Sequence, residues 1–254
     1  MKRLATALVL IPLTVWVVLW APDWAFKAVL AAIGLIAFHE FDQIAEENKI
    51  ARPGWLGMIA GLAFMLAPAP DVVIFLVAIA GMLLSLRVRE LTGSMAAAAV
   101  FILGVVYIFG AWKCAIGLHG LNPHWLMFAL LLSWVGDTAA LYVGRALGRH
   151  KLAPQVSPAK TWEGAVGSLI GGIAGGLVYA HYLIPDASIG MVMGLAAAGN
   201  IAGQVGDLCE SAMKRGAGVK DSGTTLPGHG GWLDRIDSTL FSVPVVYGLL
   251  KLVV

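Results

Sequence analysis

Long apolar segments limit what this chain can fold into more than any other feature of its sequence. A membrane-spanning helix needs roughly 20 consecutive apolar residues. The chain has 254 residues, of which 59% are hydrophobic and 13% charged, whereas soluble domains are about 45–50% apolar. A water-soluble chain of this length could not bury so much apolar surface. We therefore expect an all-α, polytopic integral membrane protein with one membrane domain, residues 1–254.

About nine spans are predicted. They are Leu4–Trp20, Trp24–Phe41, Trp55–Ala67, Val72–Leu86, Met95–Gly110, Trp125–Leu147, Trp162–Leu183, Ile189–Leu208 and Thr239–Val254. The third and fourth are short, so a broken hairpin that does not fully cross is the alternative for this pair. The first continues to Trp20 without a convincing cleavage site, and we expect it to stay as an uncleaved span. Residues 1–120 then form N-terminal helices, and residues 121–254 carry most of the polar loops.

The basic residues predict the orientation of the chain. Cytoplasmic loops of membrane proteins carry an excess of Lys and Arg. If the chain crosses at every predicted span, all basic residues except Lys27, Lys113 and Lys251 lie on the side of the N-terminus. We therefore expect the N-terminus and the loops after the second, fourth, sixth and eighth spans in the cytoplasm. The net charge of +2 gives no indication of a nucleic-acid partner.

The most polar stretch of the chain is Ser211–Ser238, SAMKRGAGVKDSGTTLPGHGGWLDRIDS. It combines cations, carboxylates and a glycine-rich turn. Cations and bare backbone amides suit phosphate oxygens, and carboxylates suit a divalent ion that bridges them. Asp234 and Asp237 are three residues apart, so on a helix they share a face and can aim at one ion. A solvated loop held by salt bridges is the alternative interpretation.

Asp137 lies midway along the sixth apolar segment, and Asp207 and Glu210 lie near the end of the eighth. A charged group at such depth costs at least about 2.5 kcal/mol, so it must face a cavity or a partner. Helical spacing of three and four residues predicts one polar stripe, formed by Asn200, Gly203, Asp207, Glu210 and Lys214. We expect a polar pocket that opens to the cytoplasm. Structural hydrogen bonds between helices are the alternative for Asp137 and Asp207.

A second polar loop spans Gly144–Gly164 and contains the sequence SPAKTWEG. Ser157 or Thr161 is expected to cap the helix that follows, and Glu163 suits the positive end of that helix. Lys160 could reach a phosphate or a lipid headgroup. The glycines of Trp162–Leu183 offer small faces for close helix packing.

Both loops resemble the phosphatidate cytidylyltransferases, also called CDP-diacylglycerol synthases. The signature of that family appears here without departure as Ser211, Lys214-Arg215, Lys220-Asp221, Pro227, His229-Gly230-Gly231, Asp234-Arg235 and Asp237. SPAKTWEG is similar to the second common element of the family. The resemblance is strongest over Trp134–Ser238 and thinner before it.

The resemblance implies transfer of a cytidylyl group from CTP to phosphatidate, which gives CDP-diacylglycerol and pyrophosphate, with Mg²⁺ as cofactor. It also implies catalytic helices within residues 121–254 and a homodimer. Compact size and the lack of a targeting extension favour a bacterial inner membrane, with the active site in the cytoplasm.

Roles follow for the individual residues. The expected Mg²⁺ ligands are Asp207, Asp221, Asp234 and Asp237. The expected substrate-binding residues are Lys160, Arg215, Lys220, Arg235, Gly230, Gly231 and Ser211. The expected catalytic residues are Asp221, Asp234, Asp237, Lys214 and His229.

Three other classes fit part of the pattern. A secondary transporter would also carry intramembrane carboxylates, but no inverted repeat is visible and the charge is densest in one loop. A prenol or sugar-phosphate transferase would also use Mg²⁺ and acidic motifs. An uninterrupted signature argues against an inactive scaffold.

Overall fold

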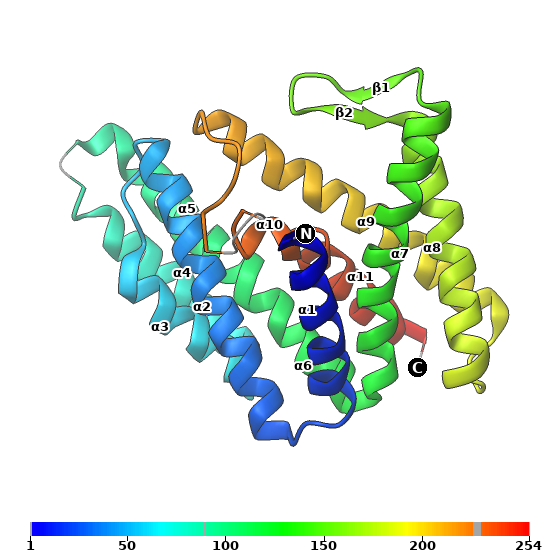
Figure 1. The fold of residues 1–254 in the computed structure, drawn as a ribbon. Coiled ribbons are helices and arrows are strands. Elements are labelled where there is room, and N and C mark those ends of the chain that lie inside the picture. Colours follow the sequence, from blue (N-terminus) through cyan, green and yellow to red (C-terminus); the bar gives the residue numbers. More distant parts are fainter. Residues whose placement is uncertain (1, 89, 226–229, 254) are drawn as a thin grey trace. The chain divides into compact units, whose positions relative to one another are not determined.

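The computed structural model describes residues 2–88, 90–225 and 230–253, and this part of the chain is mostly helical (Figure 1). The elements before the polar hairpin are α1 (Lys2–Leu19), α2 (Asp23–Glu47), α3 (Gly54–Leu66), α4 (Pro70–Ser85), η1 (Leu91–Gly93), α5 (Ser94–Gly104), the π-helical turn η2 (Val105–Gly110), α6 (Ala111–Leu121) and α7 (Pro123–Leu147). The remaining elements are β1 (Lys151–Ala153), β2 (Ser157–Thr161), α8 (Trp162–Leu183), α9 (Ile189–Gly216), α10 (Leu233–Ile236) and α11 (Thr239–Val253).

The predicted membrane helices are confirmed. Within the described residues, 6 helical stretches are long and apolar enough to cross a membrane: Asp23–Glu47, Leu91–Leu121, Pro123–Leu147, Trp162–Leu183, Ile189–Gly216 and Leu233–Val253. Shorter apolar helices cover Val9–Leu19, Gly54–Leu66 and Pro70–Ser85. The last two are the short segments for which a broken hairpin was the alternative prediction.

Several helices run further than the apolar pattern predicted. The fifth span does not end at Gly110 but continues through η2 to Leu121. Gly110 is a packing position, because a Cβ there would lie 3.2 Å from the ring of Phe64. Helix α2 continues to Glu47 and α9 to Gly216, so charged residues expected near loops lie on helices instead.

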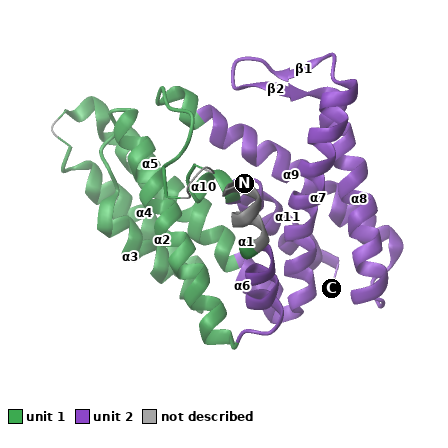
Figure 2. Ribbon diagram, in the orientation of Figure 1, with its two compact units in different colours: residues 1–10, 22–113, 213–235 green, residues 11–21, 114–212, 236–254 purple. Residues whose placement is uncertain are grey.

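The chain divides into two compact units (Figure 2). Unit 1 comprises residues 1–10, 22–113 and 213–235, and unit 2 comprises residues 11–21, 114–212 and 236–254. The boundary crosses α9, which begins in unit 2 and ends in unit 1. The separation of N-terminal and catalytic helices at residue 120 stays a prediction.

Unit 1 is packed around aromatic rings. The ring of Phe38 lies 6.2 Å from that of Phe41 and 5.6 Å from that of Phe109, centroid to centroid. Helix α3 approaches these rings through glycines four residues apart. A Cβ at Gly57 would lie 2.3 Å from Phe38, and one at Gly61 would lie 2.0 Å from Phe109. Small residues at this spacing let helices approach closely where lipid offers no hydrophobic gain.

The turn between α2 and α3 is fastened by Asp42. Its Oδ1 accepts a hydrogen bond from the amide of Gly54, and its Oδ2 accepts one from Nε of Arg52, each at 3.0 Å. Gly54 has a φ of +60°, a left-handed conformation that favours glycine. Asp42 is 1% exposed, so its charge is compensated by groups of this turn.

Unit 2 contains the glycine-faced packing that the sequence predicted. Gly167, Gly171 and Gly175 of α8 lie against side chains of α7, leaving no room for a Cβ at Gly167 or Gly171. Asn200 of α9 joins both helices, since its Nδ2 donates to the carbonyl of Leu132 at 3.4 Å and to Oγ of Ser168 at 3.2 Å. This part of the polar stripe therefore serves helix packing.

We expect Gly61→Ala to destabilise the protein by about 1–3 kcal/mol, because the added methyl group overlaps the buried ring of Phe109. Thermal unfolding in detergent measures the effect. Gly93→Ala is the control, since a Cβ at Gly93 meets nothing within 4 Å. Equal melting temperatures for the two variants would contradict the packing argument.

Candidate active site

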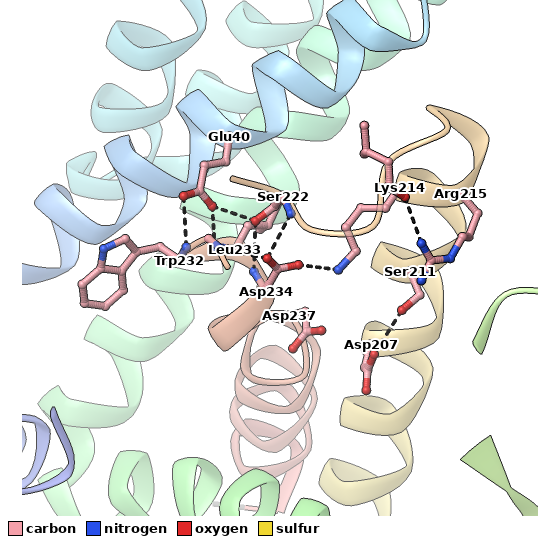
Figure 3. Close-up of polar contacts among 12 residues, drawn as sticks. Glu40, Asp207, Ser211, Lys214, Arg215, Ser222, Trp232, Leu233, Asp234 and Asp237 are labelled. Carbon is pink, nitrogen blue, oxygen red and sulfur yellow. Dashed lines mark hydrogen bonds and ion pairs between the residues drawn. The ribbon is translucent and has the colours of Figure 1, made fainter. Parts of the chain in front are cut away.

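The signature loop in unit 1 is held by Glu40, an acidic residue of α2 (Figure 3). Glu40 is 1% exposed. Its Oε1 accepts hydrogen bonds from Oγ1 of Thr225 at 2.5 Å and from the amide of Trp232 at 3.0 Å. Its Oε2 accepts hydrogen bonds from Oγ of Ser222 at 2.8 Å and from the amide of Leu233 at 2.9 Å. The buried charge is thus compensated by four donors from one loop.

Asp234 forms the second carboxylate centre of this loop. Its Oδ1 pairs with the ammonium of Lys214, which projects from the end of α9 (Figure 3). Its Oδ2 accepts hydrogen bonds from the amides of Ser222 at 2.9 Å and Gly231 at 2.8 Å. Both side chains are nearly buried. Asp234 and Lys214 were both predicted as catalytic residues, and the structure brings them into direct contact.

The signature glycines leave room for these carboxylates. Gly230 has a φ of +78°, which favours glycine, and a Cβ there would lie 2.6 Å from Oδ2 of Asp234. A Cβ at Gly231 would lie 2.1 Å from Oγ of Ser222 and 2.2 Å from Oε2 of Glu40. Close approach of side chains therefore already accounts for both glycines, which were predicted to face phosphate.

The other charged residues of the signature in unit 1 point outward. Lys220, Asp221 and Arg235 are exposed, as is Arg215, whose Nη1 donates to the carbonyl of Val219 at 3.0 Å. Exposed cations are available to phosphate oxygens. Three residues of the turn, Pro227, Gly228 and His229, lie outside the described residues, so the role predicted for His229 stays a prediction.

Unit 2 carries an acidic cluster, which we define as Asp137, Asp207, Glu210 and Asp237. The carboxylate of Asp237 is close enough to the other three for their charges to repel one another. Glu210 is fully buried, and Asp207 is partly exposed. Four acids from α7, α9 and the segment before α11 therefore gather in a chain that is largely apolar.

Asp207 of this cluster has a cationic partner in unit 2. Its Oδ2 lies 2.5 Å from Nζ of Lys160, on β2, and its Oδ1 accepts a hydrogen bond from Oγ of Ser211 at 3.3 Å. The predicted site residues Lys160, Asp207 and Ser211 are thus brought together.

Lys160 is placed by a hairpin that the sequence did not predict. Strands β1 and β2 pair antiparallel within the second polar loop. Thr161, rather than Ser157, caps α8, because its Oγ1 accepts the amide of Gly164 at 3.1 Å. The carboxylate of Glu163 accepts hydrogen bonds from the backbone amides of Arg149 and His150 and from Nδ1 of His150. These contacts order the loop beside Lys160.

Carboxylate oxygens are ligands that Mg²⁺ prefers, and the ion is usually bound by one or two of them together with substrate phosphates. Among the described residues, no group of three or more His, Cys, Asp or Glu side chains is placed so that it could hold a metal ion. The acidic cluster could therefore offer at most one or two carboxylates to an ion that substrate phosphates also bind, and the repulsion among its charges would favour such a cation. Asp207 and Asp237 of this cluster were predicted as metal ligands.

Asp234 was also predicted as a ligand, but both its oxygens are engaged by Lys214 and two amides. An ion could bind there only if Lys214 moved away.

The sequence interpretation missed Glu40, Ser222 and Thr225. The predicted span Trp24–Phe41 contains Glu40 next to its end, but no role was predicted for this residue. An acid just inside an apolar span was the available signal, because such a group needs a partner. Two of its partners are backbone amides, which carry no signal in a sequence.

Membrane helices that carry paired and exposed cations and an acidic cluster fit the class of membrane-embedded enzymes that act on phosphate groups. The family model described as "Cytidylyltransferase family" matches residues 1–253. The chain belongs to this family and is therefore a nucleotidyltransferase with multiple membrane spans.

Individual relatives agree with this assignment. The chain is 37% identical over 253 residues to the phosphatidate cytidylyltransferase of Brucella suis biovar 1 (strain 1330), covering 96% of this chain and 91% of that one. It is 33% identical over 226 residues to the phosphatidate cytidylyltransferase of Staphylococcus aureus (strain COL), covering 86% of each. The predicted family resemblance is confirmed.

We expect Lys214→Met to destabilise the protein by about 3–5 kcal/mol, because it leaves the carboxylate of Asp234 buried without its cation. The double variant Lys214→Met/Asp234→Asn should regain part of the loss. Unfolding in detergent measures both. The exposed pair of Lys27 and Asp23 is the control, and its double variant should change stability by less than about 1 kcal/mol. No recovery in the Lys214/Asp234 double variant would contradict the pairing.

Proposed function

We propose that the chain transfers a cytidylyl group from CTP to phosphatidate, giving CDP-diacylglycerol and pyrophosphate. The main support is the uninterrupted signature, whose Lys214 and Asp234 form a buried pair while its other described cations in unit 1 stay exposed. The names of the Brucella and Staphylococcus relatives describe the same activity.

The reaction needs no side-chain nucleophile. The attacking group is a phosphate monoester, which is largely anionic near neutral pH because its second pKa is about 6. An oxygen of phosphatidate forms a bond to the α-phosphorus of CTP, and the bond between that phosphorus and the bridging oxygen breaks. The electron pair of the broken bond leaves with pyrophosphate. The main obstacle is the repulsion between two polyanions.

The cations of the two polar loops would lower that repulsion. Lys214, Arg215, Lys220 and Arg235 are assigned to the phosphates of CTP and to the charge that develops on pyrophosphate. Lys160 is assigned to a phosphate or headgroup oxygen. Its pairing with Asp207 holds it beside the acidic cluster.

We assign Mg²⁺ to the acidic cluster, with Asp207 and Asp237 as the principal ligands. A bound Mg²⁺ would neutralise phosphate charge and orient the triphosphate. Asp221 stays a predicted ligand of the ion. Its side chain is exposed and therefore accessible. Asp234 fits better as the partner that fixes the ammonium of Lys214.

The acyl chains of phosphatidate would stay in the bilayer and enter between helices. The active site would face the cytoplasm, where the nucleotide is, as the basic residues of the loops favour. A bacterial inner membrane and a homodimer are the setting that the sequence and the family resemblance imply.

We expect Asp237→Asn to lower the Mg²⁺-dependent formation of CDP-diacylglycerol by at least about 100-fold, because it removes one of the negative charges that would stabilise the bound cation. The measurement uses radiolabelled CTP with phosphatidate and purified protein in detergent. Asp186→Asn, at an exposed position between α8 and α9, is the control. Full activity of a folded Asp237→Asn protein would remove this residue from the metal site.

The same assay separates the enzyme from a transporter. Label that reaches lipid only with Mg²⁺ supports cytidylyl transfer. Ion or solute flux through the protein in vesicles, without labelled lipid, would replace the proposed activity.

Orientation is tested by labelling single cysteines in a chain whose Cys114 and Cys209 are replaced by serine. With Lys151→Cys, an impermeant maleimide should react only after the membrane is opened, because this hairpin residue is assigned to the cytoplasm. With Asp186→Cys, the reagent should react in intact spheroplasts. The reverse pattern would invert the topology.

A further inference from the structure

We propose that Glu40 of α2 is a positioning residue for the signature loop and, through that loop, for the ammonium of Lys214. The inference rests on the proposed function, because Lys214 is assigned there to substrate phosphates. Glu40 is not part of the signature, and it lies 182 residues before Ser222, its first partner in the loop.

Glu40 holds both described ends of the loop. One hydroxyl and one amide reach each of its oxygens. The hydroxyls belong to Ser222 and Thr225, and the amides to Trp232 and Leu233. The hydroxyls lie before the glycine-rich turn and the amides after it, so one carboxylate sets the separation of the two ends.

Two glycines of the loop leave room for this carboxylate. A Cβ at Gly223 would lie 2.9 Å from Oε1 of Glu40, and a Cβ at Gly231 would lie 2.2 Å from Oε2. Larger residues at either position would push the loop away from α2. The glycine pattern and the four donors are independent observations, and both point to Glu40 as the centre of the loop.

A chain of contacts leads from Glu40 to Lys214. Oγ of Ser222 donates to Glu40 and accepts the amide of Asp234 at 3.3 Å. The amide of Ser222 donates to Asp234, which pairs with Lys214. Displacement of Ser222 therefore alters the position of Asp234 and of the ammonium that Asp234 holds.

Asp42 provides a matched comparison for a merely structural role. It lies two residues further along α2, is also 1% exposed, and also accepts a backbone amide and a side-chain donor. Its partners, Arg52 and Gly54, belong to the turn between α2 and α3 and not to the loop that Glu40 holds.

Replacing Glu40 by Gln keeps the shape of the side chain but removes one acceptor. The hydroxyls of Ser222 and Thr225 can rotate to accept from the new amide group, whereas a backbone N–H cannot. One of the amides of Trp232 and Leu233 therefore loses its acceptor, and the loop shifts.

The kinetic test compares Glu40→Gln with Asp42→Asn in purified protein. We expect Glu40→Gln to lower kcat by about 10- to 100-fold, because small displacements of catalytic groups have effects of this size. The KM for CTP should change by a smaller factor than kcat, because Arg215, which is also assigned to CTP, lies on α9 and outside the loop that Glu40 holds. Asp42→Asn should keep kcat within about twofold of the unsubstituted chain.

A second readout does not depend on turnover. In hydrogen exchange, peptides that cover residues 230–236 should exchange faster in Glu40→Gln and not in Asp42→Asn. If the unsubstituted protein forms no CDP-diacylglycerol, the proposed function fails. The exchange result still decides whether Glu40 orders the loop.

Three outcomes overturn the inference. They are a kcat for folded Glu40→Gln within twofold of the unsubstituted chain, equal losses of kcat in the Glu40 and Asp42 variants, and unchanged exchange of residues 230–236. If Glu40→Gln does not fold, Ser222→Ala/Thr225→Val takes its place, because it removes two donors and leaves Glu40 and both amides. Retained kcat in that variant also overturns the inference, and a loss of kcat supports it.

Discussion

The structure depends on the compensation of charges that the surrounding helices cannot solvate. An uncompensated carboxylate in an apolar bundle is costly, and each buried acid with described contacts in unit 1 has several donors. Glu40 receives two hydroxyls and two amides, Asp234 receives an ammonium and two amides, and Asp42 receives a guanidinium and an amide. Because most of these donors belong to loops, the same compensation that permits the acids to be buried also orders the loops.

The two polar clusters differ in how far their charge is compensated. In unit 1, Lys214 and the loop amides are direct partners of the carboxylates. In unit 2, the charges of four acids repel one another, and Asp207 pairs with Lys160. Cations suit phosphate oxygens and carboxylates suit a metal ion, so the two clusters offer different ligands. The chain connects the clusters twice, through α9 and through the three-residue step from Asp234 to Asp237.

Much of this could be predicted from the sequence, and the exceptions have physical causes. Apolar length predicted the membrane helices, and helical spacing placed Asn200, Asp207, Glu210 and Lys214 on one helix, as observed in α9. The pairing of Lys160 with Asp207 and of Lys214 with Asp234 joined residues that had been assigned to one site. The role of Glu40 could not be predicted, because its partners are distant in sequence and half of them are backbone groups. Gly110 was misread as a helix end because glycine marks both helix ends and close packing.

Helix α9 carries Asp207 and Lys214 as one continuous element, and this has a consequence for how the gene can vary. Seven residues of α-helix set these two groups about 10 Å apart along the axis and nearly on the same face. Insertion or deletion of one residue between them would turn one side chain by about 100° relative to the other. Substitutions that keep the helix preserve this spacing, but changes of length do not. The number of residues between Asp207 and Lys214 therefore determines their relative direction on the helix.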